Sequence, residues 1–78
     1  KGYAYYEAAL QIRRKVLGEE HADTAITWND WGELRQAQGD LAGARACYER
    51  ALHIFNARLG ADHFRTRRSQ DNLSALTQ

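Results

Sequence analysis

Apolar residues recur every three or four positions along most of the chain, the spacing of one face of an α-helix. The clearest run consists of Leu41, Ala44, Tyr48, Ala51, Leu52, Phe55 and Leu59. Strand signals are lacking, because the chain has no alternating β-branched run and no Asn-Gly or Asp-Gly turn. The pattern therefore predicts an all-α protein.

Glycines and short polar residues divide this pattern into four helices. Three of the glycines stand where a periodic run stops, and glycine tolerates the positive φ of a helix C-terminus. They are Gly18, Gly39 and Gly60. Asp40 can cap the helix after Gly39, and Asp23 or Thr24 can cap an earlier one. The predicted helices span about residues 2–17, 24–38, 41–59 and 66–77.

The chain also repeats itself with a period of 42 residues. When residues 6–36 are compared with 48–78 without a gap, 11 of 31 positions are identical, His21/His63 among them. Repeats of 20–50 residues indicate a stacked array of helical units. We name the first helix of a unit helix A and the second helix B. The helix order is then B-A-B-A, one complete unit flanked by two halves.

The complete unit resembles the tetratricopeptide repeat family. The matching positions are Trp28, Trp31 and Gly32 in helix A and Ala44, Tyr48 and Ala51 in helix B. The resemblance implies helix-turn-helix units in a right-handed superhelical solenoid, where small residues let helices approach and the aromatic fills the space between units. At the family's second aromatic position of helix A stands Arg35, which indicates a polar neighbour or an unusual edge.

The long period and the phrase LGEEHADT, residues 17–24, are similar to the longer repeats of kinesin light chains and of bacterial relatives often joined to nucleotide-binding regulatory domains. Those repeats favour His-Pro-Asp-Thr before helix A. This chain has His21-Ala22-Asp23-Thr24 and His63-Phe64-Arg65-Thr66, both without proline. We expect His21 and His63 to order the loops between units.

Charge and composition exclude several classes of function. The net charge of +1, from 11 basic and 10 acidic residues, does not indicate nucleic-acid binding. The two basic clusters, Arg13-Arg14-Lys15 and Arg65 with Arg67 and Arg68, have acidic neighbours and are expected to be solvated. No apolar run approaches the roughly 20 residues that span a membrane. We expect no nucleic-acid or membrane partner and a cytoplasmic location.

No motif for catalysis is present. His21 and Asp23 could share a metal ion only as an exposed, under-coordinated pair. Cys47, the single cysteine, is expected to fill the core as a small apolar residue, and it fits a reducing compartment. There is no Gly-rich phosphate loop and no nucleophile motif. We expect a non-enzyme with no catalytic residue, metal or cofactor.

The family resemblance implies a protein–protein interaction scaffold whose helix A residues line a concave groove for a peptide or a partner protein. The candidate partner-binding residues are Asn29, Asp30, Glu33, Gln36, Arg68, Asp71 and Asn72. Asn72 matches the asparagine with which family members clamp a peptide backbone or carboxylate, whereas Asp30 does not. The alternative is a purely structural or oligomerisation segment of a larger regulatory ATPase or signalling protein.

The sequence reads as a piece of a longer array, because it opens on Lys1 and divides a unit at each end. Such a piece would expose apolar side chains at both ends. They are Tyr3, Tyr5 and Tyr6 at one end, and Leu73 and Leu76 at the other. We therefore expect the chain to self-associate through its ends.

Overall fold

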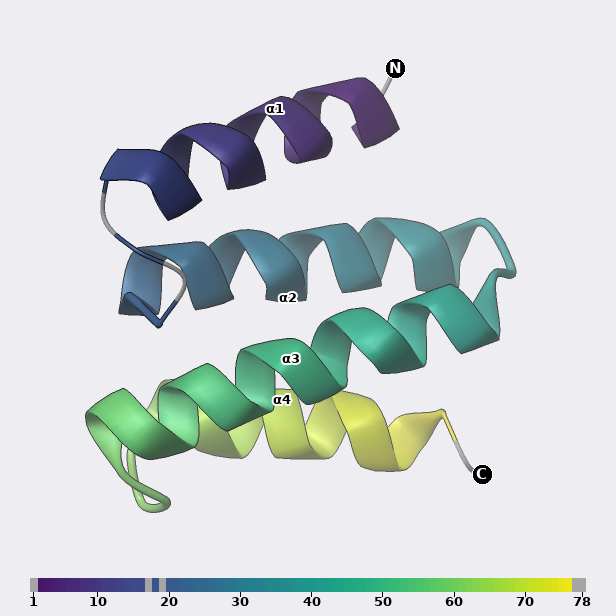
Figure 1. Ribbon diagram of the computed structural model, residues 1–78. Coiled ribbons are helices and arrows are strands. Elements are labelled where there is room, and N and C mark those ends of the chain that lie inside the picture. The colour runs from purple at the N-terminus through teal and green to yellow at the C-terminus, as the bar shows by residue number, and fades with distance from the viewer. Residues whose placement is uncertain (1, 17, 19, 77–78) are drawn as a thin grey trace.

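The computed structural model describes residues 2–16, 18 and 20–76. Within them the chain forms four α-helices and no strand: α1 (Gly2–Val16), α2 (Ala22–Ala37), α3 (Leu41–Leu59) and α4 (Phe64–Ala75). Each helix runs antiparallel to the one before it, so that α2 and α4 run in the same direction (Figure 1). The all-α helical repeat with helix order B-A-B-A is confirmed.

The helix ends match the predicted ends only in part. The α3 helix begins and ends where predicted, while α2 ends at Ala37, one residue early. Helices α2 and α4 begin at Ala22 and Phe64, each two residues before the predicted starts at about 24 and 66. The predicted end of the first helix, Leu17, and that of the last, residue 77, lie outside the described residues.

The early starts have a common cause, which is histidine capping. The Nδ1 atom of His21 accepts a hydrogen bond from the backbone N–H of Asp23 at 3.0 Å. His63 does the same for Arg65 at 3.1 Å. The expectation that both histidines order the loops is confirmed, and the predicted caps Asp23 and Thr24 are wrong. Asp40 caps α3 as predicted, accepting from the N–H of Gly43 at 2.9 Å.

The core lies along α2 and α3, which close on each other at Gly32. A Cβ atom at this glycine would lie 2.6 Å from Cε1 of Tyr48, so no side chain fits. Trp28 of α2 packs against two buried clusters. One contains Ala25, Ala51, Ile54 and Phe55, and the other contains Leu10, Trp31 and Cys47. The Tyr48 ring therefore lies inside the A–B unit, against Gly32, and not only between units as predicted.

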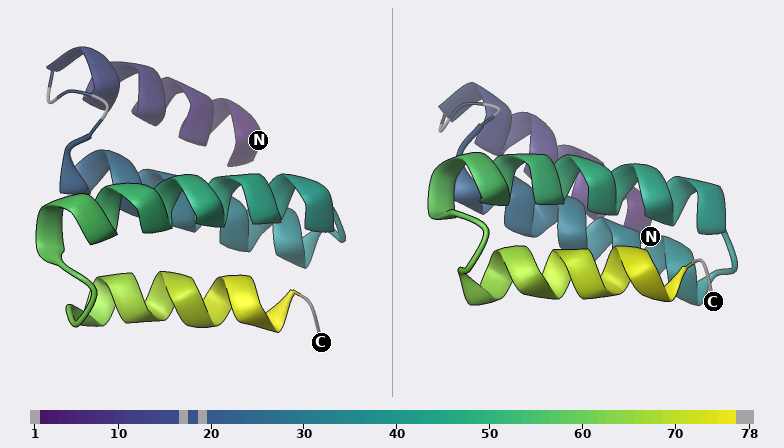
Figure 2. Two further views of the ribbon diagram at one scale, coloured as in Figure 1. Left: turned by 60° about the horizontal axis from the view of Figure 1, so that its bottom comes forward. Right: turned by 90° about the horizontal axis from the view of Figure 1, so that it is seen from below.

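Burial along α3 is broader than the predicted stripe. Leu41 is 51% exposed, whereas Ile54, outside the stripe, is fully buried. The reason is that α2 and α4 pack against different sides of α3, as the two views of Figure 2 show. Cys47 is buried as predicted, and this burial raises the pKa of its thiol, against the opposing charge of Arg35 and with a smaller contribution from the Asp40 carboxylate. The thiol is thereby kept protonated and poorly reactive.

Candidate peptide-binding groove

A cleft of about 150 Å³ opens between α2 and α4, the two helices of the A type. We call it the α2/α4 groove. Its lining residues are Ile26, Asn29, Asp30, Phe55, Phe64, Arg65 and Arg68. Because α2 and α4 come from successive units, the groove exists only through the stacking of one unit on the next.

The floor of the groove is a buried hydrogen-bond network centred on Asn29. This side chain is 8% exposed, and its Oδ1 atom accepts from Ser69 Oγ at 3.1 Å and from Asn72 Nδ2 at 3.3 Å. Both donors lie on α4. Since a buried amide oxygen without a partner is costly, these bonds fix the position of α4 relative to α2.

The rim of the groove is charged and aromatic. Arg68 Nη2 donates to Glu33 Oε2 at 3.3 Å, and both side chains remain largely accessible. Beside this pair, the Phe64 ring is 66% exposed and the Arg65 guanidinium lies 5.2 Å from its centroid. The rim therefore offers two arginines and an apolar ring to a partner.

Inside the groove, Asp30 adds a negative charge in a partly desolvated place. Burial raises the pKa of its carboxyl group above 3.8, and the nearby Glu33 carboxylate raises it further. The positive charges of Arg68, Arg65 and Arg13 act in the opposite direction. The groove thus carries both signs of charge, with the arginines at its rim.

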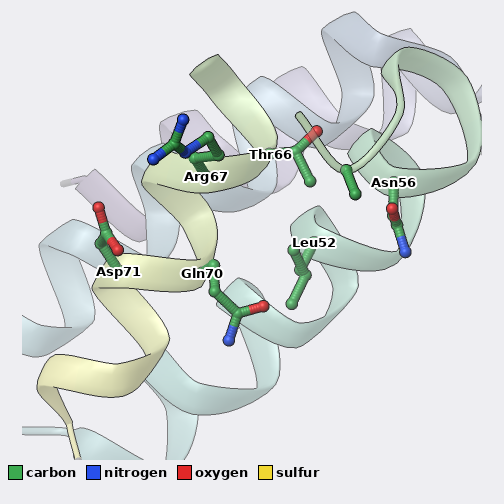
Figure 3. Close-up of a pocket in the computed structure, with 7 residues that line it drawn as sticks. Leu52, Asn56, Thr66, Arg67, Gln70 and Asp71 are labelled. Carbon is green, nitrogen blue, oxygen red and sulfur yellow. The ribbon is translucent and has the colours of Figure 1, made fainter. Parts of the chain in front are cut away.

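Five of the seven predicted partner-binding residues come together here, and two do not. Asn29, Asp30 and Arg68 line the groove, while Glu33 and Asn72 bond to residues that line it. Gln36 instead accepts a hydrogen bond from the Tyr48 hydroxyl at 2.7 Å. Asp71 lines a separate pocket between α3 and α4, with Leu52 and Gln70 (Figure 3).

Phe55, Phe64 and Arg65 line the groove and Ser69 bonds to Asn29 beneath it, but none of them was among the predicted partner-binding residues. Phe55 was assigned to the core stripe, and it does belong to a core cluster while also lining the groove. Phe64 was assigned to a loop, but it is the first residue of α4. The sequence held one signal for Ser69, which is its alignment with Thr27 in the 42-residue repeat. In the structure both side chains are buried.

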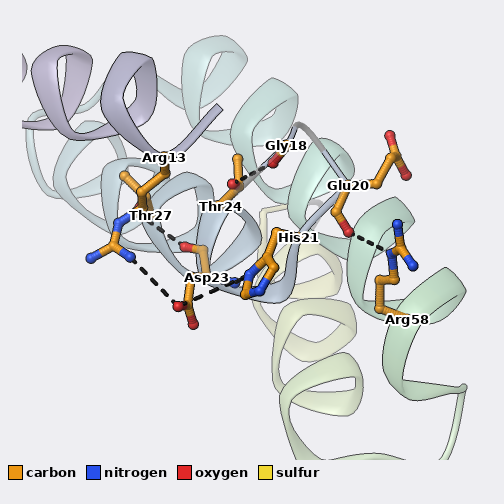
Figure 4. Close-up of polar contacts among 8 residues, drawn as sticks. All are labelled: Arg13, Gly18, Glu20, His21, Asp23, Thr24, Thr27 and Arg58. Carbon is orange, nitrogen blue, oxygen red and sulfur yellow. Dashed lines mark hydrogen bonds and ion pairs between the residues drawn. The ribbon is translucent and has the colours of Figure 1, made fainter. Parts of the chain in front are cut away.

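The loop between α1 and α2 is held by the residues of the HADT phrase and its neighbours (Figure 4). Thr24 Oγ1 donates to the Gly18 carbonyl at 2.9 Å, and Arg58 Nε of α3 donates to the Glu20 carbonyl at 2.8 Å. Arg13 Nη1 of α1 lies 3.8 Å from Asp23 Oδ2. These contacts tie the loop to three helices. Across the described ranges, no group of three or more His, Cys, Asp or Glu could hold a metal ion.

Arg35 stands at a helix A position where the family has an aromatic residue, and its guanidinium group stacks on aromatic rings. Its guanidinium carbon lies 4.3 Å from the Trp31 ring centroid and 5.1 Å from that of Tyr3. The favourable cation–π contact explains how a charged residue is kept at the contact between α1 and α2. The neighbours of Arg35 therefore include aromatic rings, and its Nη1 atom and the Asp40 carboxylate both lie beside Gly43.

The Tyr48 hydroxyl gives a prediction about pH. Burial raises the pKa of this side chain from 10.0 to about 12, with the Glu33 charge contributing. Between about pH 10 and about pH 12 the unfolded chain releases a proton that the folded chain retains, so the free energy of unfolding falls as pH rises. Tyr48→Phe is expected to cost about 1 kcal/mol near neutral pH through the lost hydrogen bond to Gln36. It should also make the alkaline loss of stability shallower, which urea unfolding on either side of pH 10 measures.

A steeper alkaline decline in Tyr48→Phe than in the parent chain would contradict this assignment. Tyr5 is the control, because it is 68% exposed. Tyr5→Phe should leave the stability near neutral pH unchanged.

The paired helices, closed at Gly32 and repeated with a 42-residue period, define a helix-turn-helix repeat protein. A tetratricopeptide repeat model matches residues 23–78, and a second model of the same description matches residues 4–23. The chain belongs to the tetratricopeptide repeat family, whose members generally mediate protein–protein interactions. A comparison with curated proteins gave no match. No helix among the described residues is long and apolar enough to cross a membrane.

Proposed function

We propose that the α2/α4 groove binds an extended peptide segment of a partner protein, and that the chain acts as a non-catalytic scaffold. The observation that carries this proposal is the cleft itself, which has room for one side chain and an exposed Phe64 ring at its rim. An apolar residue of the peptide enters between Ile26, Phe55 and Phe64. Because the groove is preformed by the Asn29 network, binding costs little ordering of the scaffold.

The polar groups of the groove define the rest of the peptide. Arg65 and Arg68 favour an acidic residue next to the apolar one. Asn72 uses one amide hydrogen on Asn29, and its second is directed to a peptide carbonyl. Asp30 disfavours a second acidic residue deep in the groove. The peptide therefore contains a single acidic residue beside an apolar anchor.

The proposal also includes the subtype of the repeat, the kind of partner and the location in the cell. The 42-residue period and the loop phrase support a kinesin-light-chain-like repeat. The nearly balanced charge supports a protein partner over nucleic acid, and the single buried cysteine fits a cytoplasmic location. The second candidate is a purely structural or oligomerisation segment within a larger regulatory ATPase or signalling protein. It is favoured by the exposed apolar side chains of α1, which are Tyr5, Ile12 and Val16.

A peptide array that pairs each apolar residue with Asp or Glu tests the proposal directly. Phe64→Ala is expected to weaken the best binder about tenfold, because truncating an interface aromatic commonly costs more than 1 kcal/mol. Fluorescence anisotropy with the labelled peptide measures this change. Since Phe64 is mostly exposed, the substitution should leave the melting temperature nearly unchanged.

Leu41→Ala is the matched control, because Leu41 is 51% exposed, apolar and outside the groove. Its peptide affinity should equal that of the parent chain. An array without binders, or equal losses in both variants, would sink the groove assignment.

A further inference from the structure

The two walls of the α2/α4 groove carry charges of opposite sign. On the α2 side, Asp30 lines the groove, and Glu33 follows it three residues later. On the α4 side, Arg65 and Arg68 line the groove, again three residues apart. Residues with this spacing are neighbours on one face of a helix. Because α2 and α4 run in the same direction (Figure 1) and Arg68 contacts Glu33, an acidic wall faces a basic wall along the groove.

These charges are only partly compensated within the chain. Arg68 Nη2 donates to Glu33 Oε2 at 3.3 Å, but the two side chains are 68% and 42% exposed. An ion pair so open to water contributes little and is easily exchanged for another. Asp30 is half-buried, and its burial and the Glu33 charge outweigh the arginines, because the pKa of its carboxyl group is raised above 3.8. The acidic wall can therefore accept a further positive charge.

A partner with charges of one sign gains little from such walls. An acidic residue that takes Arg68 away from Glu33 leaves that carboxylate beside Asp30, and like charges at neighbouring helix positions repel. A basic residue that takes Glu33 leaves Arg68 beside Arg65 in the same way. A partner that carries both charges pairs with both walls at once.

We propose that the segment bound in the α2/α4 groove is zwitterionic, with an apolar anchor between one acidic and one basic residue. This inference rests on the peptide-binding function proposed above and adds the basic residue to it. The acidic side chain pairs with the arginines of α4, and the basic side chain pairs with the carboxylates of α2. The internal pair of Glu33 and Arg68 is then exchanged for two pairs with the peptide.

The size of the cleft places the two charges next to the anchor. Its volume of about 150 Å³ has room for one side chain between Ile26, Phe55 and Phe64. In the polyproline II conformation three residues make one turn, so the residues before and after the anchor lean to opposite sides. One of them then meets α2 and the other meets α4. Which charge precedes the anchor determines the direction in which the peptide runs.

A set of short blocked peptides tests the proposal with the 78-residue chain. The peptides share a leucine anchor and differ only in its two neighbours, as Asp-Leu-Lys, Asp-Leu-Gln, Asn-Leu-Lys and Asn-Leu-Gln. Each is also made with the neighbours exchanged, which covers both directions of the peptide. NMR titration of the isotope-labelled chain measures the affinities, including weak ones. In one of the two orders, the peptide with both charges should bind about fivefold more tightly than either peptide with one charge.

Two substitutions separate the walls. Asp30→Asn should reduce the preference for Lys over Gln about threefold and retain the preference for Asp over Asn. Arg68→Gln should do the opposite. Glu49→Gln is the matched control, because it removes one negative charge from an exposed position of α3 outside the groove. It should leave both preferences unchanged, and circular dichroism checks that all variants fold.

The possible failures are distinguishable. If none of the peptides binds, the groove is not a peptide site, and the proposed function falls together with this inference. If a peptide with one charge or none binds as tightly as the peptide with both, the groove function stands and the zwitterionic partner is overturned. The same holds if Asp30→Asn and Arg68→Gln leave both preferences as they are, because the charges would then be read elsewhere.

Discussion

Gly32→Ala is expected to lower the free energy of unfolding by about 2 kcal/mol. The new Cβ atom would lie 2.6 Å and 2.8 Å from two Tyr48 ring atoms, and 3.2 Å from Cys47 Cβ. The ring is fully buried and its hydroxyl is bonded to Gln36, so it cannot swing away. Overpacking of this kind costs about 3 kcal/mol at the upper end of its usual range. The better helix propensity of alanine offsets about 1 kcal/mol of that cost.

For a chain of this size the loss corresponds to a fall in melting temperature of about 10 °C, measurable by circular dichroism. The same substitution in a Tyr48→Leu background is the control, because the obstructing ring is gone. There, Gly32→Ala should be neutral or stabilising. An equal loss in both backgrounds would show that the glycine is needed for a reason other than its contact with Tyr48.

This close approach is the part of the fold that the sequence predicted best. Small residues at Gly32, Ala44 and Ala51 mark the helix contacts, and all three lie at buried positions. Gly18, Gly39 and Gly60 have φ of 95°, 84° and 90°, as their places after the periodic runs predicted. Positions of this kind are predictable because a backbone contact or a positive φ admits few residue types.

The helix starts were less predictable, because several residues in a row could act as caps. Asp23 and Thr24 are common N-cap residues, yet His21 takes this role. The choice depends on the path of the loop, and that path is set by long-range contacts. One of them joins Arg58 of α3 to the Glu20 carbonyl. A contact between residues so far apart in the chain leaves no local pattern.

The sequence predicted a groove lined by helix A residues, but it did not predict correctly which of these residues face the groove. Asp71 and Asn72 are adjacent, so a helix that points Asn72 at Asn29 turns Asp71 away by about 100°. The rotation of α4 is set by its two buried side chains, Thr66 and Ser69. In the 42-residue repeat, Thr66 and Ser69 align with Thr24 and Thr27, which are also buried. The burial of Thr66 and Ser69 becomes evident only when α4 packs on α3.

Ser69 is also the residue that makes Asn29→Ala the most informative change in the groove. The substitution is expected to cost about 2 kcal/mol of stability, because it leaves the fully buried Ser69 hydroxyl without its acceptor. Asn72 is half-buried and can turn to water, so it adds less. Urea unfolding measures the loss. Since Asn29 is the shared acceptor between α2 and α4, peptide binding should weaken together with stability.

A double-mutant cycle with Ser69→Ala separates this network from simple packing. Ser69→Ala alone removes one donor and leaves Asn29 bonded to Asn72, so its cost should be well under that of Asn29→Ala. In the Ser69→Ala background, Asn29→Ala no longer strands a buried hydroxyl and should cost about 1 kcal/mol less. Strictly additive costs would mean that the two side chains do not couple α2 to α4. The groove would then have to be held by apolar contacts such as those of Phe55 and Ile26.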